Sequence, residues 1–132
     1  MINCYIPSRG TKTVQLYSEA LDVIREIIIK YRQSHTIILG GDSNASALQR
    51  DPTNNTDRIF RAFNSDLGIT TPNNYPEIPT FYHHDNKSKS QIDYLLNVES
   101  QANAGINSIK IMEHQSLNTS DHVLTTGIIN II

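Results

Sequence analysis

Hydrophobic residues recur at helical spacing in two segments of the chain. The longer segment is Gln15–Arg32 and the shorter one is Asp57–Leu67. Residues three and four positions apart share one face of a helix, so both segments are predicted to be amphipathic helices. The faces expected to point inward hold Leu16, Ala20, Val23, Ile24, Ile27, Ile28 and Tyr31 in the first helix, and Ile59, Phe60, Phe63 and Leu67 in the second.

Local signals mark the ends of these two helices. Thr13 and Thr56 are expected to be N-caps, because a threonine hydroxyl can accept a hydrogen bond from a free backbone N–H of the first turn. Gly68 is expected to end the second helix, because glycine adopts the left-handed conformation at little cost.

Short apolar runs outside the two helices predict strands. The predicted strands are Met1–Ile6, which Pro7 ends, followed by His35–Leu39, Thr80–Tyr82, Gln91–Val98, Ile106–Met112 and Val123–Ile132. The first strand, the first helix and the second strand form a β-α-β unit, whose strands are either neighbours or separated by one strand. Loops or turns are expected at Ser8–Gly10, Ala45–Asn55, Thr70–Pro79 and His83–Ser88.

The composition suits one small domain. A chain of 132 residues can bury a single modest core, and its 38% hydrophobic and 18% charged residues leave room for long polar loops. The net charge of −2 excludes the broad basic surface that gives non-specific affinity for nucleic acid. Any nucleic acid must therefore be held locally, with the help of a metal ion.

The single cysteine, Cys4, excludes an internal disulfide and suits a reducing compartment. Because Cys4 lies in an apolar run, it is expected to be a structural thiol rather than a nucleophile. The chain shows neither a signal peptide nor an apolar run of membrane-spanning length. An intracellular protein, nuclear or cytoplasmic, is the expectation.

Asp42 and Asn44 directly follow an apolar run that ends in Gly40 and Gly41. In extended backbone the side chains of residues 42 and 44 point to the same side, where the carboxylate can position a water and the amide can donate to a phosphate oxygen. The alternative is a turn in which the Asp42 side chain bonds the backbone two residues on.

Four further polar residues stand in or beside predicted strands. Asp93 is flanked by apolar residues and needs a partner to offset its desolvation, and His122 is a natural one. Asp121 precedes His122 and points to the other side, so one of the two can reach a metal ion and the other a phosphate. Tyr5 can offer its phenol to the same phosphate or can belong to the core. The cluster His83–Asp85 is expected to be a solvated turn rather than a zinc site.

These segments, taken in order, resemble a known family. Asn3–Pro7, Gly41–Asn44, Ser90–Tyr94 and Ser120–His122 are similar to successive motifs of the endonuclease/exonuclease/phosphatase family, which includes deoxyribonuclease I. Thr80-Phe81 before Ser90–Asp93, and Asn44-Ala45 after the glycines, most resemble the endonuclease domains of non-LTR retrotransposons, which accompany a reverse transcriptase. The similarity spans Asn3 to Gly127, and four ordered motifs are far more specific than any one of them.

The resemblance implies a fold, a reaction and roles for individual residues. The fold is the C-terminal half of a DNase I-like two-sheet α/β sandwich, and the reaction is metal-dependent hydrolysis of a phosphodiester in nucleic acid, with DNA as the expected partner. Catalytic roles fall on Tyr5 and Asn44 at the phosphate, Asp42 at the attacking water, Asp93 behind the histidine and His122 at the phosphate charge. Asp121, together with Asp42, is implied as a ligand of Mg²⁺, or of Mn²⁺ in its place.

The family's metal site also uses an asparagine and a glutamate from strands that precede this region, and this sequence has no counterpart of either. We therefore expect one apparently N-terminally truncated domain, residues 1–132, that binds its metal ion weakly and has slight or no nuclease activity. Two alternatives stay open. One is a phosphatase of phosphorylated inositol or lipid, and the other is a non-catalytic remnant or interaction module.

Overall fold

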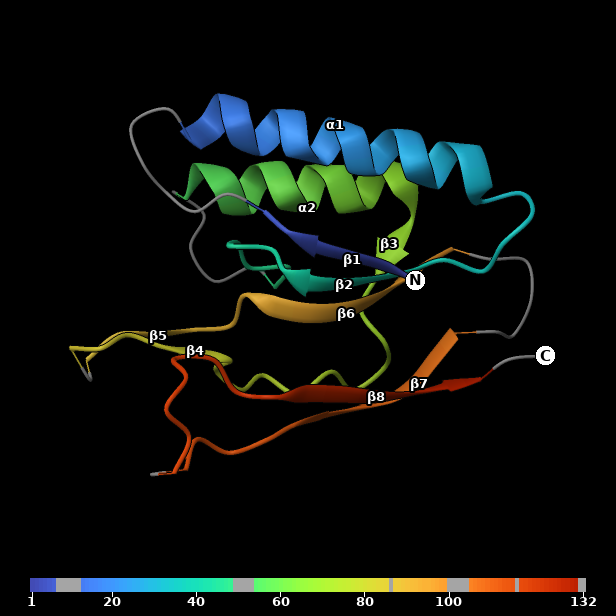
Figure 1. The fold of residues 1–132 in the computed structure, drawn as a ribbon. Coiled ribbons are helices and arrows are strands. Elements are labelled where there is room, and N and C mark those ends of the chain that lie inside the picture. Colours follow the sequence, from blue (N-terminus) through green and yellow to red (C-terminus); the bar gives the residue numbers. More distant parts are fainter. Residues whose placement is uncertain (7–12, 49–53, 86, 100–104, 116, 131–132) are drawn as a thin grey trace.

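The computed structural model describes residues 1–6, 13–48, 54–85, 87–99, 105–115 and 117–130. Two helices cover one face of a four-stranded sheet, and a two-stranded sheet lies against its other face (Figure 1). The chain therefore has the layered α/β architecture that the sequence predicts. The described part of the chain contains no helix with the length and hydrophobicity of a membrane span.

The main sheet has the strand order β1-β2-β6-β3, made of β1 (Ile2–Tyr5), β2 (Ile38–Asp42), β6 (Asp93–Val98) and β3 (Ile69–Thr70). β1 and β2 are adjacent and parallel and are joined by α1 (Thr13–Tyr31), whereas β6 runs antiparallel to β2. β3 was not expected, because its second residue begins the proline-rich stretch predicted as loop.

Gly41 allows β1 and β2 to approach closely. Its φ is +129°, and a Cβ atom at this position would lie 1.9 Å from the carbonyl oxygen of Cys4. Any side chain here would overlap the neighbouring strand, so the parallel pair depends on this glycine.

The remaining strands form two small sheets. β4 (Phe81–Tyr82) pairs with β5 (Lys89–Ser90), and β7 (Gly105–Ile111) pairs with β8 (Thr125–Asn130). The strand predicted to start at Val123 begins instead at Thr125 as β8, and the N–H of Val123 bonds to the carbonyl of Thr80.

The face of α1 that packs against the sheet differs in part from the predicted one. Its buried residues are Tyr17, Leu21, Ile24 and Ile28, whereas Leu16, Val23, Ile27 and Tyr31 are 37–58% exposed. The helix carries two adjacent apolar stripes, and the one containing Tyr17 faces inward. The phenol of Tyr17 donates a 2.8 Å hydrogen bond to the carbonyl of Ser43, which only this orientation permits.

The second helix, α2 (Asn55–Leu67), ends as predicted but starts differently. Gly68 adopts φ 66° and closes it, and the predicted inner residues Phe60, Phe63 and Leu67 are buried. Its N-cap is Asn54 rather than Thr56, because the Asn54 side chain accepts the Asp57 N–H. Thr13 lies inside the first turn of α1 rather than before it, and the predicted turn Ser8–Gly10 falls outside the described residues.

Candidate active site

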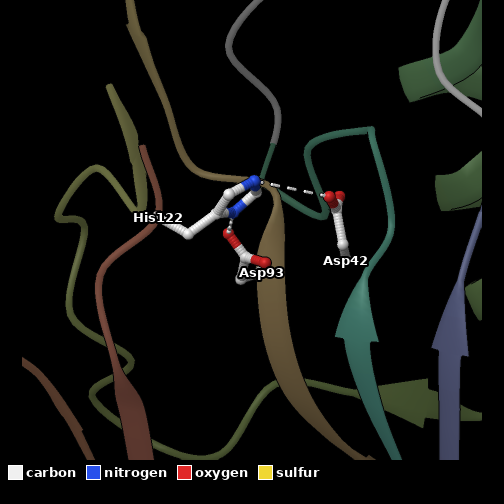
Figure 2. A group of neighbouring side chains, drawn as sticks. All are labelled: Asp42, Asp93 and His122. Carbon is white, nitrogen blue, oxygen red and sulfur yellow. Dashed lines mark hydrogen bonds and ion pairs between the residues drawn. The ribbon is translucent and has the colours of Figure 1, made fainter. Parts of the chain in front are cut away.

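Two carboxylates and an imidazole meet at one end of the main sheet. Asp42 ends β2 and Asp93 begins β6, and the antiparallel register places them directly opposite each other. His122 comes from the segment before β8, where it forms a β-bridge with Phe81. Figure 2 shows the imidazole of His122 between the two carboxylates, with Nδ1 2.9 Å from Oδ2 of Asp93 and Nε2 3.8 Å from Oδ2 of Asp42.

The contact with Asp93 fixes the orientation of His122. An ionised carboxylate can only accept a hydrogen bond, so the proton of this pair resides on Nδ1 and Nε2 is presented toward Asp42. The expected pairing of Asp93 with His122 is therefore present. The Asp93 side chain is 20% exposed, which makes it largely but not fully buried.

The surroundings of Asp42 disfavour an isolated negative charge. Burial raises the pKa of the Asp42 carboxyl, the backbone N–H of Asn44 lowers it, the charge of Asp93 raises it again and His122 lowers it, with a net upward shift. A nearby positive charge would relieve this cost.

Asn44 is held in a tight turn rather than in the extended backbone expected from the sequence. Its φ is +46°, its N–H donates to Oδ1 of Asp42 at 2.9 Å, and its side-chain amide donates to the carbonyl of Ile6 at 2.6 Å. The alternative interpretation of Asp42 as a turn former is thus correct, and the same turn brings Asn44 to the cavity beside the cluster.

A cavity of about 650 Å³ opens beside this cluster. Tyr5, Asp42, Asn44 and His122 line it, and Lys89 of β5 adds a cationic side chain that the sequence did not single out. Tyr5 is 75% exposed, so the interpretation of Tyr5 as a core residue is wrong. The structure therefore gathers all five residues predicted to be catalytic at one end of the sheet, four on the cavity and Asp93 behind His122.

Asp121 takes a different place. Its side chain is exposed and lines a neighbouring cavity of about 310 Å³ with Tyr82, Lys89 and His114, while its carbonyl accepts the Tyr82 N–H at 2.7 Å. The structure does not bring the Asp121 carboxylate into the cluster around His122.

The cluster suits a divalent cation. Asp42, Asp93 and His122 offer ligand atoms within 4.8 Å of one another, and no other group of three such residues occurs among those that the structure describes. Carboxylate oxygens are the ligands that hard cations such as Mg²⁺ and Mn²⁺ take, and a cation would offset the charge at Asp42. Because His122 Nδ1 is engaged by Asp93, most of the binding would fall on carboxylate oxygens.

The other candidates behave as structural residues. His83–Asp85 lie in the turn of the β4–β5 hairpin, as predicted, with the Asp85 carboxylate accepting the N–H groups of Lys87 and Ser88. His84 and Asp85 are exposed, whereas His83 is half-buried and lines the cavity of about 650 Å³. Cys4 is half-buried, and burial, followed by the charge of Asp42, raises the pKa of its thiol to about 11. A thiol with this pKa is a poor nucleophile at neutral pH.

Comparison with known proteins gives a family match and structural matches. The sequence model of a family described as endonuclease-reverse transcriptase matches residues 1–126. Among solved structures, the fold is similar to that of the 3′ phosphatase NExo from Neisseria bound to product DNA hairpin, with 17% sequence identity and a TM-score of 0.75. This match covers 98% of the present chain and 60% of the NExo chain. No curated protein matches the sequence. The DNase I-like α/β fold expected from the motifs is confirmed.

Proposed function

The chain belongs to the endonuclease-reverse transcriptase family, and on that premise we propose that it hydrolyses phosphodiester bonds in nucleic acid, with DNA as the substrate, with the help of Mg²⁺ or Mn²⁺. The observation that carries this proposal is the convergence of Asp42, Asp93 and His122 beside a polar cavity. The ordered motifs favour the retrotransposon type of endonuclease.

The carboxylate of Asp42 is placed to orient the attacking water and to accept its proton. As the water oxygen bonds to phosphorus and the bond to the leaving oxygen breaks, negative charge grows on the phosphate. A protonated His122 can donate from Nδ1 to Asp93 and from Nε2 to this charge, so Asp93 holds the imidazole in the useful orientation.

Tyr5 and Asn44 would hold the phosphate from the other side of the cavity. The phenol of Tyr5 is exposed there, and the Asn44 amide keeps one hydrogen after bonding to Ile6. A divalent cation at Asp42 and Asp93 would supply positive charge to the phosphate. The implied role of Asp121 as a metal ligand requires its side chain to turn away from the neighbouring cavity, so we expect weak cation binding and slow turnover.

Two observations favour DNA over an inositol or lipid phosphate. The matching family is described as an endonuclease family, and the similar NExo structure holds a product DNA hairpin. Lys89 on the cavity adds a local positive charge that can contact a phosphate backbone despite the net charge of −2.

The proposal is tested by incubating the purified chain, in excess, with supercoiled plasmid and Mg²⁺. We expect slow conversion to nicked circles that stops when the cation is chelated. The variant Asp42→Ala/His122→Ala should show no conversion. The matched variant His35→Ala/Asp66→Ala, which also removes one imidazole and one carboxylate but from exposed positions, should retain the wild-type rate.

Equal conversion by the wild type and the Asp42→Ala/His122→Ala variant would contradict the proposal. A parallel reaction with an inositol phosphate distinguishes the alternatives. Release of phosphate from that substrate without nicking of DNA would favour the phosphatase, and no turnover of either substrate would favour the non-catalytic remnant.

A further inference from the structure

Thr80 directly precedes β4 and lies opposite the point where the chain leaves β5 for β6, because its N–H donates to the carbonyl of Ser90 at 2.9 Å. Its side chain is fully buried. The hydroxyl oxygen of Thr80 accepts two backbone hydrogen bonds, from the N–H groups of Ile92 and Asp93, each at 3.1 Å. One hydroxyl thus satisfies two consecutive amides, and the second amide belongs to the residue that orients His122.

These amides lie at the start of β6, on the edge away from β2, where the described residues provide a neighbouring strand only at the far end. β3 pairs only with Asn97 and Val98 at the far end of β6. Nearer the site, the Leu95 N–H is accepted by the phenol of Tyr75, and the Asp93 N–H by Thr80. Side-chain hydroxyls therefore replace a strand along this edge. An N–H that is shielded from water and left without an acceptor destabilises the fold, which explains why a hydroxyl is needed here.

The backbone of Thr80 connects the same point to His122. The Thr80 carbonyl accepts the N–H of Val123 at 2.9 Å, and the next residue, Phe81, forms the β-bridge with His122. Thr80 is therefore bonded through its side chain to Asp93 and through its carbonyl to the residue after His122. Thr80 thus bonds to the chain at both halves of the Asp93–His122 pair, which are 29 residues apart in sequence.

A second buried hydroxyl holds the other side of the same peptide group. The carbonyl of Ile92 accepts the N–H of Ser43 at 2.8 Å, and the Ser43 hydroxyl, which has one hydrogen to donate, lies 2.8 Å from both this carbonyl and that of Ala45. Ser43 follows Asp42 directly, so the peptide group before Asp93 is held from the Asp42 side as well. The hydroxyl of Thr80 is what fixes this peptide on the His122 side.

We propose that Thr80 is a positioning residue that holds Asp93 at hydrogen-bonding distance from His122. The importance of Thr80 for catalysis rests on the proposed function, whereas its effect on the Asp93–His122 hydrogen bond can be tested without it. Loss of the Thr80 hydroxyl would leave the partly buried N–H groups of Ile92 and Asp93 without their acceptor, so the chain at Asp93 would shift. A hydrogen bond of 2.9 Å weakens when its partners move by several tenths of an ångström.

Two substitutions separate the hydroxyl from the packing of Thr80. Thr80→Val keeps the shape of the side chain and removes the hydroxyl, whereas Thr80→Ser keeps the hydroxyl and removes the methyl group. Amide hydrogen exchange at Ile92 and Asp93 reports the two bonds to Thr80, with Leu96 in the same strand as an internal control. The ¹⁵N signals of the His122 imidazole report which ring nitrogen carries the proton.

In Thr80→Val we expect at least tenfold faster exchange at Ile92 and Asp93, unchanged exchange at Leu96, and loss of the single Nδ1–H tautomer of His122. Thr80→Ser should match the wild type in both measurements. Faster exchange with an unchanged imidazole signal would overturn the proposal, because Thr80 would then be merely structural.

Rapid exchange of the Ile92 and Asp93 amides in the unaltered protein would overturn the proposal without any substitution, even if Thr80→Val does not fold. Each of these measurements is made without substrate. Absence of nuclease activity would therefore count against the proposed function alone.

Discussion

The hydrogen bond between helix α1 and the turn after β2 provides the sharpest test of how the fold supports the site. The phenol of Tyr17 is fully buried and donates to the carbonyl of Ser43 at 2.8 Å. Burial also raises the pKa of Tyr17, so the phenol keeps its proton and remains a donor across the accessible pH range. The substitution Tyr17→Phe removes this donor and leaves the ring in place.

The expected loss follows from the groups that remain. The ring still fills its site, so the cost of a large cavity does not arise. The Ser43 carbonyl loses the donor that Tyr17 provides, and leaving a buried acceptor unpaired costs about 1–3 kcal/mol. We expect the free energy of unfolding to fall by about 2 kcal/mol, which for a domain of this size lowers the midpoint of thermal unfolding by roughly 6–10 °C.

Urea and thermal unfolding, followed by circular dichroism, measure this loss. The matched control is Tyr31→Phe, also in α1, where the side chain is 40% exposed and a change within about 0.5 kcal/mol is expected. If Tyr17→Phe is as stable as Tyr31→Phe, the Ser43 carbonyl is satisfied in another way and the account of how α1 is oriented is wrong.

Two further predictions concern Asp93 and Cys4. Asp93→Asn should lower kcat/KM for DNA cleavage roughly 10- to 150-fold, because it removes a charged hydrogen bond worth about 1.5–3 kcal/mol. The exposed control Asp66→Asn should stay within about twofold of the wild type in the same plasmid assay. Equal rates for the two variants would remove Asp93 from the mechanism. Cys4 should react with iodoacetamide about 100-fold more slowly at pH 8 than a thiol of pKa 9.0, because its pKa of about 11 leaves about a hundredfold less thiolate. Mass spectrometry should show the Cys4 rate rising about tenfold per pH unit to near pH 11, and a plateau near pH 9 would show that the thiol is not desolvated.

The sequence was a good guide where local chemistry decides the structure. Gly68 ends α2 because few other residues tolerate its conformation, and Asp93 finds His122 because a carboxylate in an apolar strand needs a partner. The five residues predicted to be catalytic meet for two reasons. Tyr5, Asp42 and Asp93 stand at strand ends on one edge of the main sheet. The turn after β2 adds Asn44, and the β-bridge with Phe81 adds His122.

The sequence was a poorer guide where tertiary contacts decide between local alternatives. Both apolar stripes of α1 satisfy helical periodicity, and the buried one is the stripe that packs into the core and bonds Tyr17 to the carbonyl of Ser43. The direction of the Asp121 side chain likewise depends on the β-bridge between Phe81 and His122, which no periodicity encodes.

The close approach of β1 and β2 at Gly41 has a genetic consequence. Every missense change at this codon adds a Cβ atom, and a Cβ atom here would overlap the carbonyl of Cys4 at 1.9 Å. All alleles altered at this codon should therefore share one phenotype, displacement of β1 and of Tyr5 at its end, whatever the new side chain. A gene copy that accumulates mutations could therefore lose the shape of the site through any amino-acid substitution at this codon, while both carboxylates and the histidine stay intact.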